Sequence, residues 1–149
     1  MNLGGRDAGI GIDHNPDAVA AARARGLVAF LPEEFARSSF AGDRFDSLLF
    51  SHVLEHMSSS EAKELVANYL PHLRAGGRVV TITPQEVGFR SDSTHVEFFD
   101  LDDLAELARA LDLEPVRSYS FPFPRPVGRI FKHNEFVLVA ESSGNAAGS

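Results

Sequence analysis

The chain has 149 residues, of which 44% are hydrophobic and 23% are charged, and its formal net charge is −7 at pH 7. That length fits one domain that buries about 70% of its unfolded surface, and the acidic balance excludes a protein held to nucleic acid by a basic face. No stretch reaches the roughly 18 apolar residues of a membrane-spanning helix, the N-terminus lacks the plan of a signal peptide, and there is no cysteine. We therefore expect a soluble, cytoplasmic, single-domain protein without a nucleic-acid or membrane partner.

The first part of the chain predicts two strands, each followed by a helical segment. An apolar run at residues 8–13 predicts the first strand, and Asn15-Pro16 is typical of the capped start of a helix, which is expected to end before Gly26. Residues 27–31 predict the second strand. Residues 32–38 predict a turn or a short helix.

The second part continues this alternation. A nearly continuous apolar run at residues 45–50 predicts a strand that is covered on both faces. An amphipathic pattern predicts a helix over about residues 58–74, and Pro71 predicts a kink or a tighter final turn within it. Gly76-Gly77 is expected to end that helix before a strand over residues 78–83. The remaining expected elements are a helix over residues 101–111, strands over 116–121 and 136–140, and a disordered tail over 142–149.

Strands that alternate with helices predict an α/β protein with an open, mostly parallel sheet and flanking helices. No repeat or linker divides the sequence, so we expect a single domain over residues 1–141. Ligands of such sheets bind beyond the carboxyl ends of the strands. The candidate site residues therefore lie in the segments 13–15, 32–34, 51–56 and 84–85, and after Phe121.

Four pieces of sequence near these strand ends have a characteristic order and spacing. They are GIDHNPDAV at residues 11–19, SHVLEHM at 51–57, LRAGGRVV at 73–80 and THV at 94–96. Together they resemble class I S-adenosylmethionine-dependent methyltransferases, of the type 11-like group that acts mostly on small molecules. The resemblance covers about residues 9 to 141. It implies a Rossmann-like fold, S-adenosylmethionine as cofactor, and methyl transfer to a small-molecule acceptor.

The resemblance also implies which residues contact the cofactor. Asp13 matches the family's ribose-binding acid, and an acid at a strand end can accept both ribose hydroxyls; a turn or helix-capping role is the alternative. Glu33 falls where the family usually places an acid against the adenine. His14, Ser51 and His52 are further expected cofactor contacts at the strand ends.

A second set of residues predicts the catalytic centre. His52, Glu55 and His56 are spaced i, i+3 and i+4, so in a helical turn they share one face, and His95 can join them from a later loop. We expect His52 and His95 to act as a general base or to orient the substrate, with structural hydrogen bonding as the alternative. Some relatives, including small-RNA 2′-O-methyltransferases and a quinone-pathway O-methyltransferase, hold a divalent metal with a Glu/His set here. The wider family does not, so no metal is expected, and ligation by these four side chains is the alternative.

A proline-rich segment follows the predicted strand that ends at Phe121. Proline at alternate positions over residues 121–126 predicts an extended surface loop. Its Phe and Arg side chains either line a pocket for a flat or anionic substrate or cover the edge of the core.

The front of the family pattern is missing from the sequence. In the family, a strand, a glycine-rich loop and a helix precede the ribose-binding acid, whereas only twelve residues precede Asp13. Because such a crossover needs about ten to twelve residues beyond its strands, we expect a truncated chain or a fragment. A deletion variant repaired as a homodimer is the alternative. The alternative function is a degenerate, non-catalytic module for binding or dimerisation.

Overall fold

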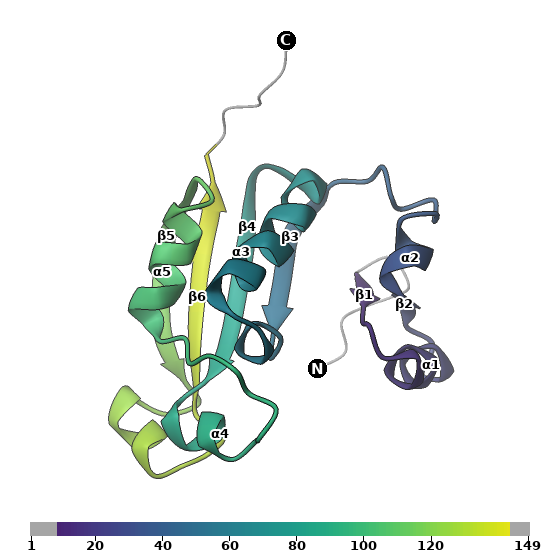
Figure 1. Ribbon diagram of the computed structural model, residues 1–149. Coiled ribbons are helices and arrows are strands. Elements are labelled where there is room, and N and C mark those ends of the chain that lie inside the picture. The colour runs from purple at the N-terminus through teal and green to yellow at the C-terminus, as the bar shows by residue number, and fades with distance from the viewer. Residues whose placement is uncertain (1–8, 144–149) are drawn as a thin grey trace. The chain divides into compact units, whose positions relative to one another are not determined.

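The computed structural model describes residues 9–143, which belong to two compact units that meet in sequence between Asp43 and Arg44 (Figure 1). A single domain over residues 1–141 stays a prediction. Ser142, expected as the first residue of the tail, is the last residue of a strand, and residues 144–149 lie outside the described part. Between residues 9 and 143, no helix has the length and apolar character that crossing a membrane requires.

The first unit is a small β-α-β arrangement followed by a short helix. Its elements are β1 (Ile10–Ile12), α1 (Pro16–Ala24), β2 (Val28–Phe30) and α2 (Pro32–Phe35). The two strands pair in parallel, with Ile10 opposite Val28. The predicted helix start is confirmed, because the Asn15 side chain accepts the backbone N–H of Asp17. The Phe30 ring packs against Phe35 and Phe40.

The second unit contains a four-stranded sheet with helices on one face. Its elements are β3 (Phe45–Ser51), η1 (Leu54–His56), α3 (Ser59–Tyr69), η2 (Leu70–His72), β4 (Leu73–Pro84), α4 (Glu86–Arg90), α5 (Leu101–Arg109), β5 (Leu113–Phe121), η3 (Arg125–Arg129) and β6 (Glu135–Ser142), where η marks a 3₁₀ turn. Figure 1 shows α3 and α5 over the same face of the sheet.

The strand order is β3-β4-β6-β5. β3 and β4 are parallel, and β6 runs antiparallel to both β4 and β5. Three of the four strands therefore share one direction, and the expected α/β fold with an open, mostly parallel sheet is confirmed. β6 differs because it returns directly from β5, without the long helical crossover that a parallel connection requires.

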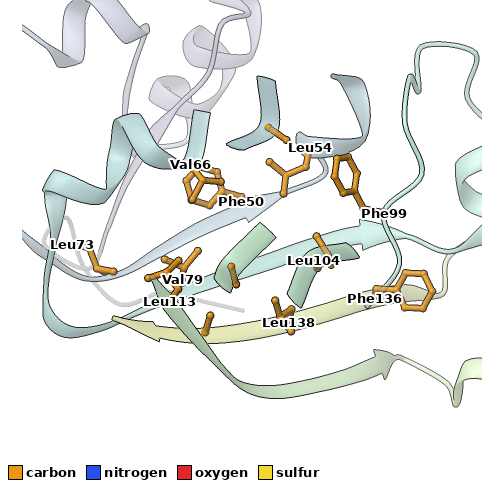
Figure 2. Packing of buried hydrophobic residues seen from close by; sticks show 13 residues of the cluster. Phe50, Leu54, Val66, Leu73, Val79, Phe99, Leu104, Leu113, Phe136 and Leu138 are labelled. Atoms are coloured by element: carbon orange, nitrogen blue, oxygen red, sulfur yellow. The ribbon is translucent and has the colours of Figure 1, made fainter. Parts of the chain in front are cut away.

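The core of this unit lies between the sheet and its two long helices. Figure 2 shows the side chains of β3, β4 and β6 pointing toward those of α3 and α5. The largest contributors are fully or almost fully buried: Phe50, Leu54, Val66, Leu73, Val79, Phe99, Leu104, Leu113, Phe136 and Leu138. This packing fixes the ends of β3 and β4, which carry the candidate site.

One boundary predicted from the sequence is wrong. The 3₁₀ turn η2 confirms the tighter final turn expected at Pro71, but β4 begins at Leu73, so Gly76 and Gly77 lie inside a strand rather than at a helix end. The β3–β4 register shifts here, and Gly76 has a φ of +68°. An added Cβ at Gly77 would lie 2.6 Å from Leu73 Cδ1. The glycines therefore allow an irregular bend in β4.

A buried polar network holds the connection between β5 and β6. Gln85 and Asn134 are both fully buried, and Asn134 Nδ2 donates to Gln85 Oε1 at 3.1 Å. Gln85 Nε2 donates to Ser120 Oγ and to the Glu135 carbonyl, each at 2.9 Å. Phe123 N donates to Asn134 Oδ1 at 2.9 Å. Each of these buried groups is satisfied, so the network orders the whole connection.

Gly128 tests this network, because an added Cβ there would lie 1.7 Å from Gln85 Oε1 and 2.8 Å from Gln85 Cβ. Gln85 cannot withdraw without breaking its hydrogen bonds. We expect Gly128→Ala to lower the free energy of unfolding by about 1–3 kcal/mol, as overpacking does, measured by urea denaturation. The control is Gly42→Ala, where no atom lies within 4 Å of the added Cβ. Equal midpoints for the two variants would contradict the close packing at Gly128.

Candidate functional site

Asp13 directly follows β1 and begins the turn into α1. Its backbone N–H donates to the Phe30 carbonyl at 3.1 Å, and its Oδ1 accepts the N–H of Asn15 at 2.8 Å. Asp13 and His14 are both exposed. The carboxylate therefore has the turn role that the sequence left open, and its remaining lone pairs can still accept ribose hydroxyls.

Glu33 lies in the first turn of α2 and its side chain is exposed. The neighbouring Glu34 makes the structural contacts instead. It accepts the Leu31 N–H at 2.9 Å and the Arg23 guanidinium at 2.6 Å. These two contacts hold the pKa of Glu34 below its usual range. Glu33 is thus the acid of this turn that is left for a ligand.

His52 immediately follows Ser51, the exposed last residue of β3. Its backbone N–H donates to the Ile82 carbonyl at 3.0 Å, which continues the hydrogen bonds between β3 and β4. Its φ of +53° lies in the left-handed region, which is uncommon outside glycine. The ring lies between two carboxylates: Nδ1 is 3.2 Å from Glu55 Oε1, and Nε2 is 2.8 Å from Glu135 Oε1. The strained backbone is therefore held at a position where both ring nitrogens are engaged.

The two carboxylates raise the pKa of His52 to about 9, first through the hydrogen bond to Glu55 and then through Glu135, while partial burial opposes the shift. In this arrangement the ring is a cation near neutral pH and donates from both nitrogens. That geometry suits a group that positions its neighbours better than a general base, and the catalytic role of His52 stays a prediction. No sequence signal pointed to Glu135, which lies 83 positions from His52.

Glu55 lies in the 3₁₀ turn η1, beside the core residue Leu54, and is fully buried. Its carbonyl accepts the N–H groups of Val96 and Glu97, at 2.7 and 3.3 Å, which ties the later loop to this turn. Its Oε1 pairs with His52, whereas its Oε2 has no hydrogen-bond partner among the described residues. A buried carboxylate oxygen without a partner is energetically costly.

His56 and His95 lie beside Glu55, with their ring centroids 4.9 Å apart. The His95 ring stacks on Phe89, and its Nδ1 is 2.7 Å from the Phe89 carbonyl. His56 Nδ1 is 3.3 Å from the Thr94 carbonyl. One ligand atom from each of Glu55, His56 and His95 lies within 4.8 Å of the others. The structure thus brings together three of the four side chains that the sequence offered only as an alternative set of metal ligands, while His52 contacts this group through Glu55.

The loop after β5 differs from its predicted extended form, because a 3₁₀ turn begins at Arg125. The Arg125 guanidinium makes a bidentate pair with Glu86, at 2.9 and 2.5 Å, and lies 4.7 Å from the Phe136 ring centroid. Arg125 therefore packs at the edge of the core. Phe121 and Phe123 are 55% and 47% exposed.

The ion pair between Arg125 and Glu86 should make the stability of the fold depend on pH. The hydrogen bond from Arg125 is the main cause that lowers the pKa of Glu86 below its usual 4.5. A lowered pKa in the folded state stabilises the fold above the unfolded-state pKa, and this contribution is lost as the pH falls through the folded value. We expect wild type to be more stable than Glu86→Gln by up to about 1 kcal/mol at neutral pH, with a difference that shrinks below about pH 4.5.

Urea denaturation at several pH values measures this difference. The control is Glu114→Gln, which removes an exposed carboxylate from β5. A stability difference for Glu86→Gln that stays constant down to about pH 3 would contradict the linkage.

Comparison with known proteins agrees with this architecture. A family model described as Methyltransferase domain matches residues 3–81, which is more than half of the chain. No curated protein matches the chain.

Solved structures of methyltransferases share the fold. A SAM-dependent methyltransferase from Archaeoglobus fulgidus has a TM-score of 0.70 and 17% identity, covering 89% of this chain and 75% of that one. The 1,6-didemethyltoxoflavin-N1-methyltransferase of Burkholderia thailandensis has a TM-score of 0.59 and 21% identity, covering 90% and 60%. The magnesium protoporphyrin IX methyltransferase of Synechocystis PCC 6803 has a TM-score of 0.62 and 12% identity, covering 90% and 59%.

The chain spans less than two thirds of the last two of these proteins. The match to the family model nevertheless covers the segments that carry Asp13, Glu33, His52 and Glu55. The resemblance expected from the sequence is confirmed, and with it the cofactor type. The chain belongs to the class I S-adenosylmethionine-dependent methyltransferase family.

Proposed function

We propose that the protein transfers the methyl group of S-adenosylmethionine to a small-molecule acceptor. The match to the methyltransferase domain family is the observation that carries this proposal. The Burkholderia and Synechocystis proteins are named for small-molecule acceptors, 1,6-didemethyltoxoflavin and magnesium protoporphyrin IX. The net charge of −7 disfavours a nucleic-acid acceptor. The lack of cysteine is compatible with a reducing cytoplasm, where we place the protein.

The first unit supplies the groups that fit the cofactor. Asp13 keeps carboxylate lone pairs beyond its bond to Asn15, which suits the two ribose hydroxyls. His14 is exposed beside it, and Glu33 is the exposed acid after β2. When bound, the cofactor supplies an electrophilic methyl group on its sulfonium. The contribution of the first unit is then to hold the ribose and adenine of the cofactor.

The second unit supplies the acceptor side. Ser51 and His52, at the end of β3, are also the cofactor contacts predicted for this unit. Glu55 pairs with His52, and the Glu55 carbonyl accepts the N–H of Val96, the residue after His95. Holding two reactants in line is the main source of rate in such a reaction, worth several kcal/mol. We assign His52 to orienting the acceptor and His95 to orienting it or taking its proton.

Calorimetric titration of the 149-residue chain with S-adenosylhomocysteine tests the proposal. We expect micromolar binding, which Asp13→Asn weakens at least tenfold because a neutral amide accepts the ribose hydroxyls poorly. The matched control is Asp17→Asn, which removes an acid from the first turn of α1 without touching the strand end, and which should bind as wild type does.

A second candidate function is a non-catalytic module for binding or dimerisation. It is favoured by the strand pairing among the described residues, where β1 pairs only with β2, and β3 only with β4. A chain that unfolds cooperatively, fails to bind S-adenosylhomocysteine and sediments as a homodimer would support this module and overturn the proposed methyl transfer.

A further inference from the structure

We propose that the connection between β5 and β6 docks on the surface of an anionic lipid bilayer. The docking surface consists of three apolar side chains and two cations: Phe121, Phe123, Ile130, Arg129 and Lys132. This inference goes beyond the proposed function, because it concerns where the protein binds and not which reaction it performs. The sequence predicted no membrane partner because no stretch is long enough to span a bilayer, whereas a segment that lies in the interface needs no such stretch.

The first argument is the exposure of large apolar side chains on this connection, which lies beside α4 beyond the end of the sheet (Figure 1). Ile130 is 84% exposed, the highest value among the large apolar side chains of the described residues. Phe121 and Phe123 are about half exposed. The Phe123 ring packs edge-on against Phe131, with a centroid distance of 5.5 Å, so Phe131 continues the apolar surface behind it. Exposed apolar side chains that gather on one segment indicate an interaction surface.

The second argument is the charge of the same segment. Residues 121–134 contain Arg125, Arg129 and Lys132, whereas all 21 acidic residues of the chain lie outside them. Glu86 is engaged by the bidentate pair with Arg125 and has only a weaker charge interaction with Arg129. Arg129 and Lys132 are exposed, and within the described part of the chain no hydrogen bond or salt bridge holds their side chains. The segment is therefore locally positive on a chain whose net charge is −7.

The third argument is that the exposed part has few backbone donors left to pair. The N–H of Phe123 donates to Asn134 Oδ1 at 2.9 Å, and its carbonyl accepts from Asn134 Nδ2 at 3.1 Å. The N–H groups of Ile130 and Phe131 donate to the Val127 carbonyl, at 3.0 and 2.8 Å. Three prolines in the same segment have no N–H. Apolar side chains on such a backbone can enter a lipid layer without carrying these donors into it unsatisfied.

These features together favour an anionic bilayer over a protein partner. Protein interfaces are held in part by regular hydrogen bonds, and this surface offers few unpaired backbone donors for them. Anionic lipids attract basic side chains near the bilayer surface. Arg and Lys lay their apolar stems along an apolar layer while their charged heads stay in water, and exposed apolar side chains enter the boundary between headgroups and acyl chains. Charges more than about 8 Å away are largely screened at physiological ionic strength, so the acidic remainder of the chain does not cancel this attraction.

Sedimentation of the 149-residue protein with lipid vesicles tests the inference. The vesicles contain equal parts of phosphatidylglycerol and phosphatidylcholine, or phosphatidylcholine alone. We expect the protein to bind the mixed vesicles about tenfold more tightly than the neutral ones, because only the mixed surface attracts the two cations. This preference should shrink as the salt concentration rises, since salt screens the charges.

Variants of exposed side chains separate the two contributions. Ile130→Ser should weaken binding to the mixed vesicles about tenfold, because it removes the most exposed apolar side chain. Lys132→Gln should weaken it about fivefold, because it removes one cation. The matched controls are Leu27→Ser, which changes an exposed leucine of the first unit, and Lys63→Gln, which changes the other lysine of the chain, on α3. Both controls should bind as wild type does.

Equal binding to both kinds of vesicle would overturn the inference, as would the absence of binding by the folded wild type. A homodimer of the wild type that Ile130→Ser dissociates would also overturn it, because the surface would then face a second copy of the chain. Circular dichroism verifies that each variant is folded. S-adenosylhomocysteine binding is measured separately without vesicles, so a failure of docking is distinguishable from a failure of the cofactor site.

Discussion

The burial of the 3₁₀ turn after β3 is the constraint on which the rest of the candidate site depends. Leu54 enters the core, and the next residue of the turn, Glu55, is fully buried as well. The carbonyl of Glu55 then accepts two N–H groups from the loop at Val96 and Glu97, a segment about 40 positions later. One apolar anchor thus places a carboxylate below the surface and draws a distant histidine loop beside it.

Two buried polar sites of the second unit differ in how completely their hydrogen bonds are satisfied. Around Gln85 and Asn134, donors and acceptors are matched, and the network serves to order a long connection. At Glu55, one oxygen is matched by His52 and the other is not. Folding alone favours complete satisfaction of buried polar groups. Glu55 Oε2 and Thr81 Oγ1 are the two buried side-chain oxygens in the described part of the chain that lack a hydrogen-bond partner.

Local signals in the sequence predicted most of the helices and strands, while the roles of the candidate site residues stay predictions. Asn15 predicted the start of α1, and Pro71 predicted the tight turn after α3, because capping and the missing N–H of proline act within a few residues. The predicted start of β4 was wrong because Gly76-Gly77 was interpreted as a helix end, and glycine is equally common at helix ends and at bends within strands. The spacing of His52, Glu55 and His56 predicted their proximity. Glu135 and Asn134 were missed, because only the fold brings them to β3 and β4.

The connection between β5 and β6 has a buried base, which is held by hydrogen bonds, and an exposed outer part. Gln85 and Asn134 fix the base from inside, while Phe121, Phe123 and Ile130 stay on the surface, with Ile130 84% exposed. The outer side chains contribute little to the packing of the sheet. Substitutions among them can accumulate over evolution without a loss of stability. The same sheet can therefore carry a chemically different connection between β5 and β6 while its core stays unchanged.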